Sequence, residues 1–427
     1  MTFLPVMAAA ALCYGAGAAS VVIDATRPAS DRVHPANPSI VGIGDDWTLG
    51  EVLWTNASVV GATASLRNGL TRFPGGACSN YWNLSASTVV SPCSRADCAG
   101  SQGWCYVGER VSALAAGTFD VAQFLKGVAG ATAEQLPVID LNVMHFADVR
   151  PLVRTVLAGA ASSGRNAPQR WELGNEYYIA KDYDCFLPNA TVYASRALQA
   201  IRDIKELVPG ARVAVIMQAD DFLQSPGANY SGPWNTGMVR SGVLASADAF
   251  TLHDYSLYPS DFHHMDPSQW ANAIAAWSEA HVVTIGASTE QVLGPYAARG
   301  LPVWMTEFGI LEKVFNSSEY FSRFVNHGGL KAHYVVGRQM AALLRPELFG
   351  VLQYYCQGGQ GWGLDTGVTR WANGTGVLEV DGMGQVLAHF ADRVINHADS
   401  VWNATQRPDD AQVHAGSRAR AAASGRA

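Results

Sequence analysis

Short apolar segments alternate with longer amphipathic segments about eight times along this chain of 427 residues. The short segments are typical of strands, and the longer ones carry apolar residues at helical spacing. Strands that alternate with helices form parallel sheets. Because about eight units fill roughly 330 residues, the pattern favours a closed (β/α)8 barrel, the TIM barrel, over an open sheet.

The expected strands are residues 40–43, 70–73, 136–143, 170–176, 212–217, 249–252, 302–305 and 349–355. The expected helices are residues 50–68, 119–131, 149–161, 189–208, 267–299, 330–344 and 384–398. The clearest helix is 189–208, which has Val192, Ile201 and Ile204 along one side and ends at Pro209-Gly210.

Polar residues lie at or just after the ends of several of these strands, namely Arg72, Asn142, Glu176, Gln218, His253 and Glu307. In a parallel barrel the carboxyl ends of all strands meet on one face, and active sites are built there. We therefore expect these side chains to share one site.

Two of these strand-end residues are glutamates. Glu176 follows Asn175 at the end of the fourth expected strand, and Glu307 comes just after the seventh. A single glutamate in this position can simply cap the next helix, but glycoside hydrolysis requires two carboxyl groups in one cleft. The pair therefore predicts a glycosidase, with Glu176 as the general acid/base and Glu307 as the nucleophile.

The two roles require different protonation states. The acid must start protonated, so we expect partial burial and the neighbouring carboxylate to raise the pKa of Glu176. The nucleophile must start ionised, and Arg72 is the candidate cation beside Glu307. Arg72 could alternatively form a purely structural ion pair.

Further substrate-binding candidates are Arg72, Asn142, Asn175, His253, Tyr255 and Trp362. Asn175 would bind the sugar 2-hydroxyl, or form a turn with Gly174. His253 and Tyr255 would orient Glu307 or fill the barrel rim, and Trp362 would stack on a sugar ring or belong to the core. The acidic pairs 45–46 and 220–221 are typical of solvated loops, and we predict no metal and no cofactor.

The start of the chain indicates secretion. Residues 3–19 are apolar or small and end in a small-residue cleavage pattern, although no basic residue precedes them. We favour a signal peptide at 1–19 over a retained anchor, and no later segment is an apolar run of the ~18 residues that span a membrane.

The cysteines agree with this compartment. Six remain after residue 19: Cys78, Cys93, Cys98, Cys105, Cys185 and Cys356. An even number suits disulfides in an oxidising compartment, and the spacing of the first four is unusual for a zinc knuckle.

Seven Asn-x-Ser/Thr sequons occur, at Asn56, Asn83, Asn189, Asn229, Asn316, Asn373 and Asn403. Together with the cysteines they predict a secreted eukaryotic glycoprotein, extracellular or associated with a cell wall. The formal net charge is −7 and basic residues cluster only at 418–426. This charge excludes a nucleic-acid binder and leaves carbohydrate as the expected partner, with the oligomeric state open.

These motifs resemble those of the clan A retaining glycoside hydrolases, in which Asn-Glu ends strand four and a second glutamate ends strand seven. The segment 172–176, Glu-Leu-Gly-Asn-Glu, is similar to that of heparanase-like β-glucuronidases. The segment 72–76, Arg-Phe-Pro-Gly-Gly, is similar to that of α-L-arabinofuranosidases, and His253-Asp254-Tyr255 resembles the His-x-Tyr of the heparanase-like enzymes.

Both families carry a β-sandwich after the barrel, for which this chain has little room. We expect a reduced or truncated accessory β-region. The expected organisation is a signal peptide (1–19), a strand and linker (20–38), the barrel (39–362), a closing β/helix segment (363–402) and a disordered tail (403–427).

The sequence therefore predicts a secreted retaining glycosidase, with a heparanase-like β-glucuronidase slightly ahead of an α-L-arabinofuranosidase. The lack of basic clusters argues against a highly sulfated substrate. The rival interpretation is a non-catalytic carbohydrate-binding glycoprotein on the same barrel.

Overall fold

The computed structural model describes residues 42–44, 54–66, 69–83, 88–89, 120–131, 136–144, 148–179, 189–219, 233–254, 266–293, 300–308, 335–339, 341–342, 349–354, 369–371, 378–380 and 382–390. The expected signal peptide, linker and tail lie outside these residues. So do Tyr255, Trp362, Cys93, Cys98, Cys105, Cys185, Cys356, Asn229, Asn316, Asn373 and Asn403.

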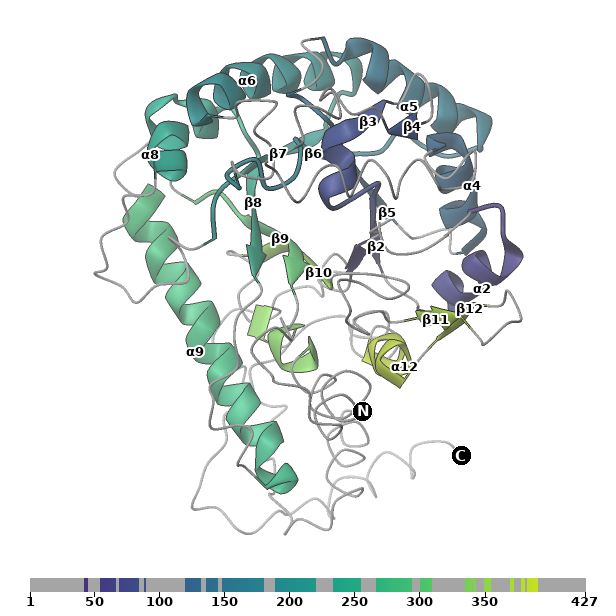
Figure 1. Ribbon diagram of the computed structural model, residues 1–427, viewed down its shortest axis with the longest axis vertical. Coiled ribbons are helices and arrows are strands. Elements are labelled where there is room, and N and C mark those ends of the chain that lie inside the picture. Colours follow the sequence, from purple (N-terminus) through teal and green to yellow (C-terminus); the bar gives the residue numbers. More distant parts are fainter. Residues whose placement is uncertain are drawn as a thin grey trace, which may run out of the picture.

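Eight parallel strands form a closed barrel, which confirms the predicted fold (Figure 1). In chain order they are β1 (Gly42–Gly44), β2 (Leu70–Phe73), β5 (Leu136–Asp140), β6 (Arg170–Glu172), β7 (Arg212–Ile216), β8 (Ala249–Asp254), β9 (Val303–Phe308) and β10 (Phe349–Tyr354). Each strand pairs with the next, and β10 closes the ring on β1. Glu176 and Glu307 thus follow or end the fourth and seventh strands, as expected.

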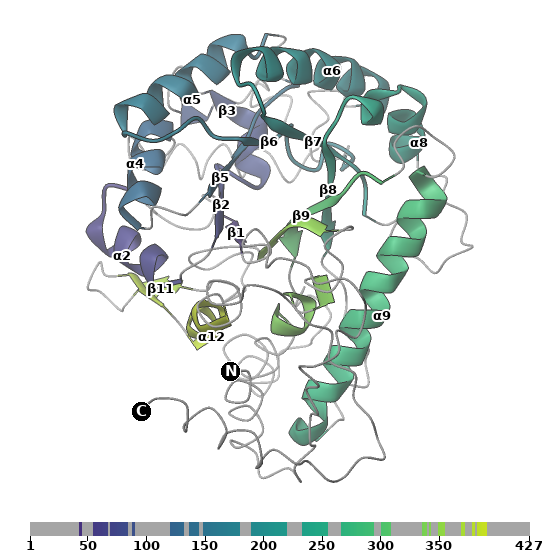
Figure 2. The ribbon, with the colours of Figure 1, turned by 180° about the vertical axis from the view of Figure 1, so that it is seen from behind.

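Helices surround the strands, as both ribbon views show (Figures 1 and 2). They are α2 (Ala57–Leu66), α4 (Val121–Ala131), α5 (Arg150–Ser162), α6 (Ala190–Leu207), α8 (Pro233–Arg240) and α9 (Pro267–Leu293). Residues 335–339 and 341–342 are also helical, within the helix expected at 330–344. Helix α8 was not expected, because its eight residues are too few to establish a period. Among the described helices, none is both long and apolar enough to cross a membrane.

Side chains on the strands alternate between two cores. Leu70, Val138, Ala214, Ala249 and Trp304 pack inside the barrel. The residues between them, such as Phe73, Ile139 and Phe250, face the surrounding helices in the larger core. Because each strand is covered on one face by the barrel interior and on the other by helices, its sequence is a nearly continuous apolar run.

Two small sheets lie outside the barrel. Strands β11 (Thr369–Trp371) and β12 (Leu378–Val380) form an antiparallel pair within the stretch that was expected to be strand-like. Strand β12 and helix α12 (Gly382–Phe390) pack against α2 (Figure 1). Strands β3 (Trp82–Asn83) and β4 (Thr88–Val89) pair between Cys78 and Cys93, where no strand was expected. Cys78 lies in the preceding short 3-10 helix η2 (Ala77–Tyr81).

Helix α6 is buried along a face of small residues, including Ala194, Ala197 and Ala200. Val192, which the sequence placed on the apolar side, is 40% exposed, because it does not lie on this buried face. On the buried face, the Tyr193 hydroxyl donates to the Leu173 carbonyl at 2.9 Å and accepts from the Ile216 amide at 3.0 Å. One side chain thus joins α6 to the ends of β6 and β7.

We expect Tyr193→Phe to lower the free energy of unfolding by about 1–3 kcal/mol, because it leaves a buried amide and a buried carbonyl without the hydroxyl that they hydrogen-bond. Chemical denaturation measures the change. The matched control is Ser65→Ala, which removes an exposed hydroxyl bonded at 2.9 Å to its own helix and should change stability by less than about 0.5 kcal/mol. Equal effects in the two variants would contradict the bridging role of Tyr193.

Candidate active site

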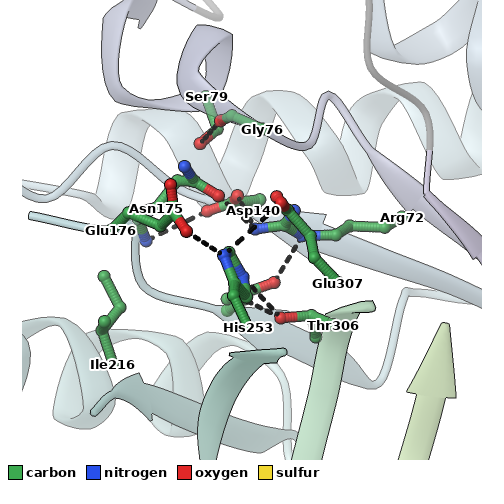
Figure 3. Close-up of polar contacts among 12 residues, drawn as sticks. Arg72, Gly76, Ser79, Asp140, Asn175, Glu176, Ile216, His253, Thr306 and Glu307 are labelled. Carbon is green, nitrogen blue, oxygen red and sulfur yellow. Dashed lines mark hydrogen bonds and ion pairs between the residues drawn. The ribbon is translucent and has the colours of Figure 1, made fainter. Parts of the chain in front are cut away.

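The site is built around the guanidinium of Arg72, which lies near the end of β2 and is only 1% exposed. Its Nε donates to Glu172 at 2.6 Å and its Nη1 to Glu307 at 2.6 Å (Figure 3). Its Nη2 donates to both Asp140 and Asn175 at 2.9 Å. One cation therefore binds acceptors from β5, from β6 and the turn that follows it, and from β9.

The turn after β6 holds Glu176 in an unusual backbone conformation. Glu176 has φ 46°, in the left-handed region that few residues other than glycine, asparagine and aspartate adopt. Gly174 also has a positive φ of 83°, and a Cβ there would lie 2.3 Å from the Tyr177 ring. Such local strain persists where surrounding contacts determine the conformation, and it often marks a functional site.

Two buried side chains hold this turn. The Asp140 carboxylate accepts from the Gly174 amide at 3.0 Å, and the Asn80 Oδ1 accepts from the Asn175 amide at 2.8 Å. The Asn80 side-chain amide also donates back to the Asn175 carbonyl. Asn80 comes from η2, after β2, so a distant loop fixes the position of Glu176.

His253, near the end of β8, connects the two glutamates. Its Nδ1 lies 2.9 Å from Glu176 Oε1 and 3.5 Å from Glu307 Oε2. The sequence predicted that His253 orients Glu307 or fills the barrel rim. The ring does lie beside Glu307, and it also hydrogen-bonds to Glu176, so an orienting role stays a prediction. On the other side of the ring, Nε2 lies 3.1 Å from Thr306 Oγ1, whose hydroxyl donates to Glu172 at 2.8 Å.

A β-bulge brings Thr306 and Glu307 to the same side of β9. Leu252 pairs with Met305, but the next residue, His253, pairs with Glu307. The extra residue in β9 interrupts the alternation of side chains, so both Thr306 and Glu307 contact the barrel interior. A regular strand would have turned one of them toward the helices.

The two glutamates are close enough to act on one bond. One oxygen of Glu176, one oxygen of Glu307 and one ring nitrogen of His253 all lie within 4.8 Å of one another. Glu307 is nearly buried, whereas the Glu176 side chain is 21% exposed. The more accessible carboxyl is thus the one assigned to proton transfer. The same three groups could ligate a cation, but in this structure they hydrogen-bond to each other and to Arg72.

The buried charges shift one another's pKa. Burial and the repulsion from Glu172 raise the pKa of Asp140 to about 7, although Arg72 opposes the shift. Burial disfavours ionised Glu172, but Arg72 and His253 outweigh it and lower the pKa of Glu172. Burial also disfavours charged His253, yet Glu307 and Glu176 raise the pKa of His253 to about 10.

The expected pKa shift of Glu176 is corrected by this geometry. Burial acts to raise the pKa, as predicted, but the cationic ring of His253 outweighs it and lowers the pKa of Glu176. This direction is opposite to the predicted one and favours ionised Glu176 beside a protonated His253. The two groups share a hydrogen bond of 2.9 Å.

The structure brings together Arg72, Asn175, Glu176, His253 and Glu307, as the sequence predicted. Asn142 is buried and accepts a hydrogen bond from Tyr177 at 3.2 Å, so its expected role in substrate binding stays a prediction. Sequence reasoning missed Asn80, Asp140, Glu172 and Thr306 as parts of the site. Asp140 and Glu172 could have been found, because a carboxylate within an apolar strand requires a buried partner.

Several solved structures share this fold. A family 51 α-L-arabinofuranosidase from Bifidobacterium longum is 13% identical, covers 89% of this chain and 77% of its own, and has a TM-score of 0.59. A counterpart from Thermotoga petrophila is 14% identical, with coverages of 87% and 73% and a TM-score of 0.59. No protein-family model and no curated protein matches the sequence. At these identities the similarity shows that the chain shares the barrel fold of these enzymes.

We expect His253 to stabilise the fold most strongly in acid and neutral solution. Its folded pKa of about 10 exceeds the ordinary value of 6.5, so the stabilisation is complete below pH 6.5 and is lost as the pH rises toward 10. The difference in unfolding free energy between wild type and His253→Gln should therefore shrink over this range, by at most a few kcal/mol since each pKa unit corresponds to about 1.36 kcal/mol.

Denaturant titrations at several pH values test this expectation. The control is His389→Gln, which removes an exposed histidine in the last turn of α12. A difference for His253→Gln that stays constant or grows from pH 6.5 to 10 would contradict the assigned charge.

Proposed function

We propose that this chain is a retaining glycoside hydrolase in which Glu307 is the nucleophile and Glu176 the acid/base. The observation that supports it is the approach of the two carboxyl groups, whose oxygens lie within 4.8 Å at the carboxyl ends of β6 and β9. Retaining enzymes separate these groups by about 5–5.5 Å, whereas inverting enzymes leave roughly 6.5–9.5 Å for a water molecule.

In the first step, Glu307 attacks the anomeric carbon while the proton shared by Glu176 and His253 passes to the leaving oxygen. The C1–O bond breaks and a covalent glycosyl-enzyme forms. In the second step, Glu176 takes a proton from water, the water attacks the same carbon, and Glu307 leaves as a carboxylate. Arg72 stabilises ionised Glu307 before and after the reaction through its hydrogen bond of 2.6 Å.

The charge of the site suits the transition state. Four carboxyl groups (Asp140, Glu172, Glu176 and Glu307) surround one guanidinium and one imidazole. The transition state carries positive charge on the sugar ring, and preorganised negative charge stabilises it. The same field would repel an anionic sugar.

This charge argument favours a neutral sugar, so we place α-L-arabinofuranosides first among candidate substrates. Arg72 already binds three carboxylates and offers little to a sugar carboxylate. The segment 72–76, similar to that of arabinofuranosidases, forms the end of β2 and the turn after it. The two enzymes with TM-scores of 0.59 are α-L-arabinofuranosidases. A β-glucuronidase remains the second candidate, supported by the segment 172–176.

A protein that binds sugar without hydrolysing it would not need a proton between His253 and Glu176. The strained backbone of Glu176 and the hydrogen bond from His253 serve proton transfer, and neither is required to hold a sugar. These features support an active enzyme over a non-catalytic relative.

We expect one aryl glycoside from a panel of α-L-arabinofuranoside, β-glucuronide, β-xyloside and β-glucoside to be hydrolysed. Glu307→Ala should abolish turnover. Glu176→Ala should cost about 10²–10⁴-fold on substrates with poor leaving groups and much less on activated ones, because only the former need a proton. Glu206→Gln, a change at a 62% exposed surface glutamate, is the control.

Added azide separates the two roles. In Glu307→Ala, azide can displace the aryl group directly and give a glycosyl azide of inverted configuration. In Glu176→Ala, azide attacks the covalent intermediate and gives the retained configuration. Activity that survives both substitutions unchanged would refute the two-glutamate mechanism.

The proposal includes secretion. Among the described sequons, Asn189 is exposed and caps α6, its Oδ1 accepting from the Val192 amide at 2.9 Å. A glycan on Nδ2 leaves this cap intact. Expression in a eukaryotic secretory host should give medium-borne protein whose mass falls on enzymatic deglycosylation, and Asn189→Gln should reduce the fall by one glycan. Protein retained in cells and unglycosylated would contradict the assignment.

A further inference from the structure

The ring of His253 is enclosed by charged groups from several strands. Glu307 lies 3.5 Å and Glu176 2.9 Å from Nδ1, and Glu172 lies 3.9 Å from Nε2. Arg72 binds Glu172 and Glu307, and Asp140 lies on the far side of Arg72. On its own strand, Asp254 turns to the other face, where it pairs with His281 at 2.8 Å and with Arg338.

Hydrogen-bond directions determine which nitrogen of His253 carries a proton. An ionised carboxylate only accepts, so the Thr306 hydroxyl donates to Glu172 at 2.8 Å. The Thr306 oxygen is then available as an acceptor toward Nε2 at 3.1 Å. Nε2 must therefore carry a proton in both the neutral and the cationic ring.

This assignment leaves Nδ1 with two states toward Glu176. It donates to ionised Glu176 when the ring is cationic, or it accepts from protonated Glu176 when the ring is neutral. Both states contain the same extra proton. Removing that proton would set the bare lone pair of Nδ1 against a carboxylate at 2.9 Å, which is unfavourable.

We propose that Thr306 and Glu172 are positioning residues that keep His253 protonated on Nε2, and thereby keep an acidic proton on the His253–Glu176 pair. The inference rests on the proposed function, in which this proton protonates the leaving group. In this proposal Thr306 and Glu172 act through His253 and not on the sugar itself. Their role is to exclude the neutral tautomer with hydrogen on Nδ1, which would donate to Glu176 and leave the site without an acid.

The surrounding structure supports a dedicated role for this pair. Both residues are completely buried, and Thr306 reaches the barrel interior only because of the bulge in β9. The raised pKa of His253 agrees with a ring that holds its proton at neutral pH.

The test is Thr306→Val, which keeps the shape of the side chain and removes the acceptor for Nε2. After the His253–Glu176 pair loses its extra proton, the neutral ring can then carry its remaining hydrogen on Nδ1 and donate it to ionised Glu176. The alkaline limb of the kcat/KM profile reports the pKa of the acid in the free enzyme. This limb should move down by about one to two pH units, because that shift corresponds to the free energy of one hydrogen bond to a charged group. The acid limb should stay in place.

Two variants control the experiment. Thr306→Ser retains the hydroxyl and should keep the wild-type limb. Thr251→Val makes the same substitution at another buried threonine, on β8 two residues before His253, and should leave the limb unchanged. If Thr306→Val does not fold, Thr306→Ala makes the same deletion with less demand on packing.

A second readout does not depend on turnover. ¹⁵N NMR of histidine-labelled protein, with His253 assigned by its loss in His253→Gln, distinguishes the two tautomers. We expect hydrogen on Nε2 in the wild type and, at alkaline pH, hydrogen on Nδ1 in Thr306→Val. An unmoved or raised alkaline limb, an equal shift in Thr306→Ser, or the same tautomer in both proteins would overturn the inference. If the wild type hydrolyses no glycoside, the proposed function fails, while the spectra still decide the tautomer.

Discussion

The site depends on the buried ion-pair network of Arg72. Three carboxylates and one amide from different parts of the barrel share this guanidinium, and only a planar cation with five donors can bind them at once. Burying charges is costly unless they are paired, so loss of the cation would leave Glu172, Asp140 and Glu307 repelling one another inside the barrel. The network therefore serves the fold and the chemistry together.

The remaining negative charge explains the other features of the site. Four carboxyl groups beside one guanidinium leave an excess of negative charge, which bound protons reduce. The raised pKa values of Asp140 and His253 are consistent with this excess. The same excess prepares the site for a positively charged transition state. Strain at Glu176 and the bulge at Thr306 then place these groups where a regular barrel would not put them.

Much of the site could be predicted from strand ends. Arg72, Asn175, Glu176, His253 and Glu307 each follow or end an apolar run, and a parallel barrel brings such positions to one face. Asn80 gave no comparable signal, since it lies outside every expected strand and helix and contacts backbone groups of Asn175. Thr306 is one residue from a predicted nucleophile, yet its direction depends on a bulge that strand pairing creates.

The eight-strand barrel and the two strand-end glutamates could be predicted from the chain alone, because hydrophobic periodicity and the order of elements are local properties. The partner that each polar side chain meets depends instead on how the strands pack together. His253 hydrogen-bonds to Glu176 at 2.9 Å as well as lying 3.5 Å from Glu307, and its charged ring lowers the pKa of Glu176. The physical reason is that protonation depends on burial and on charges a few ångströms away, and those neighbours come from strands far apart in the sequence.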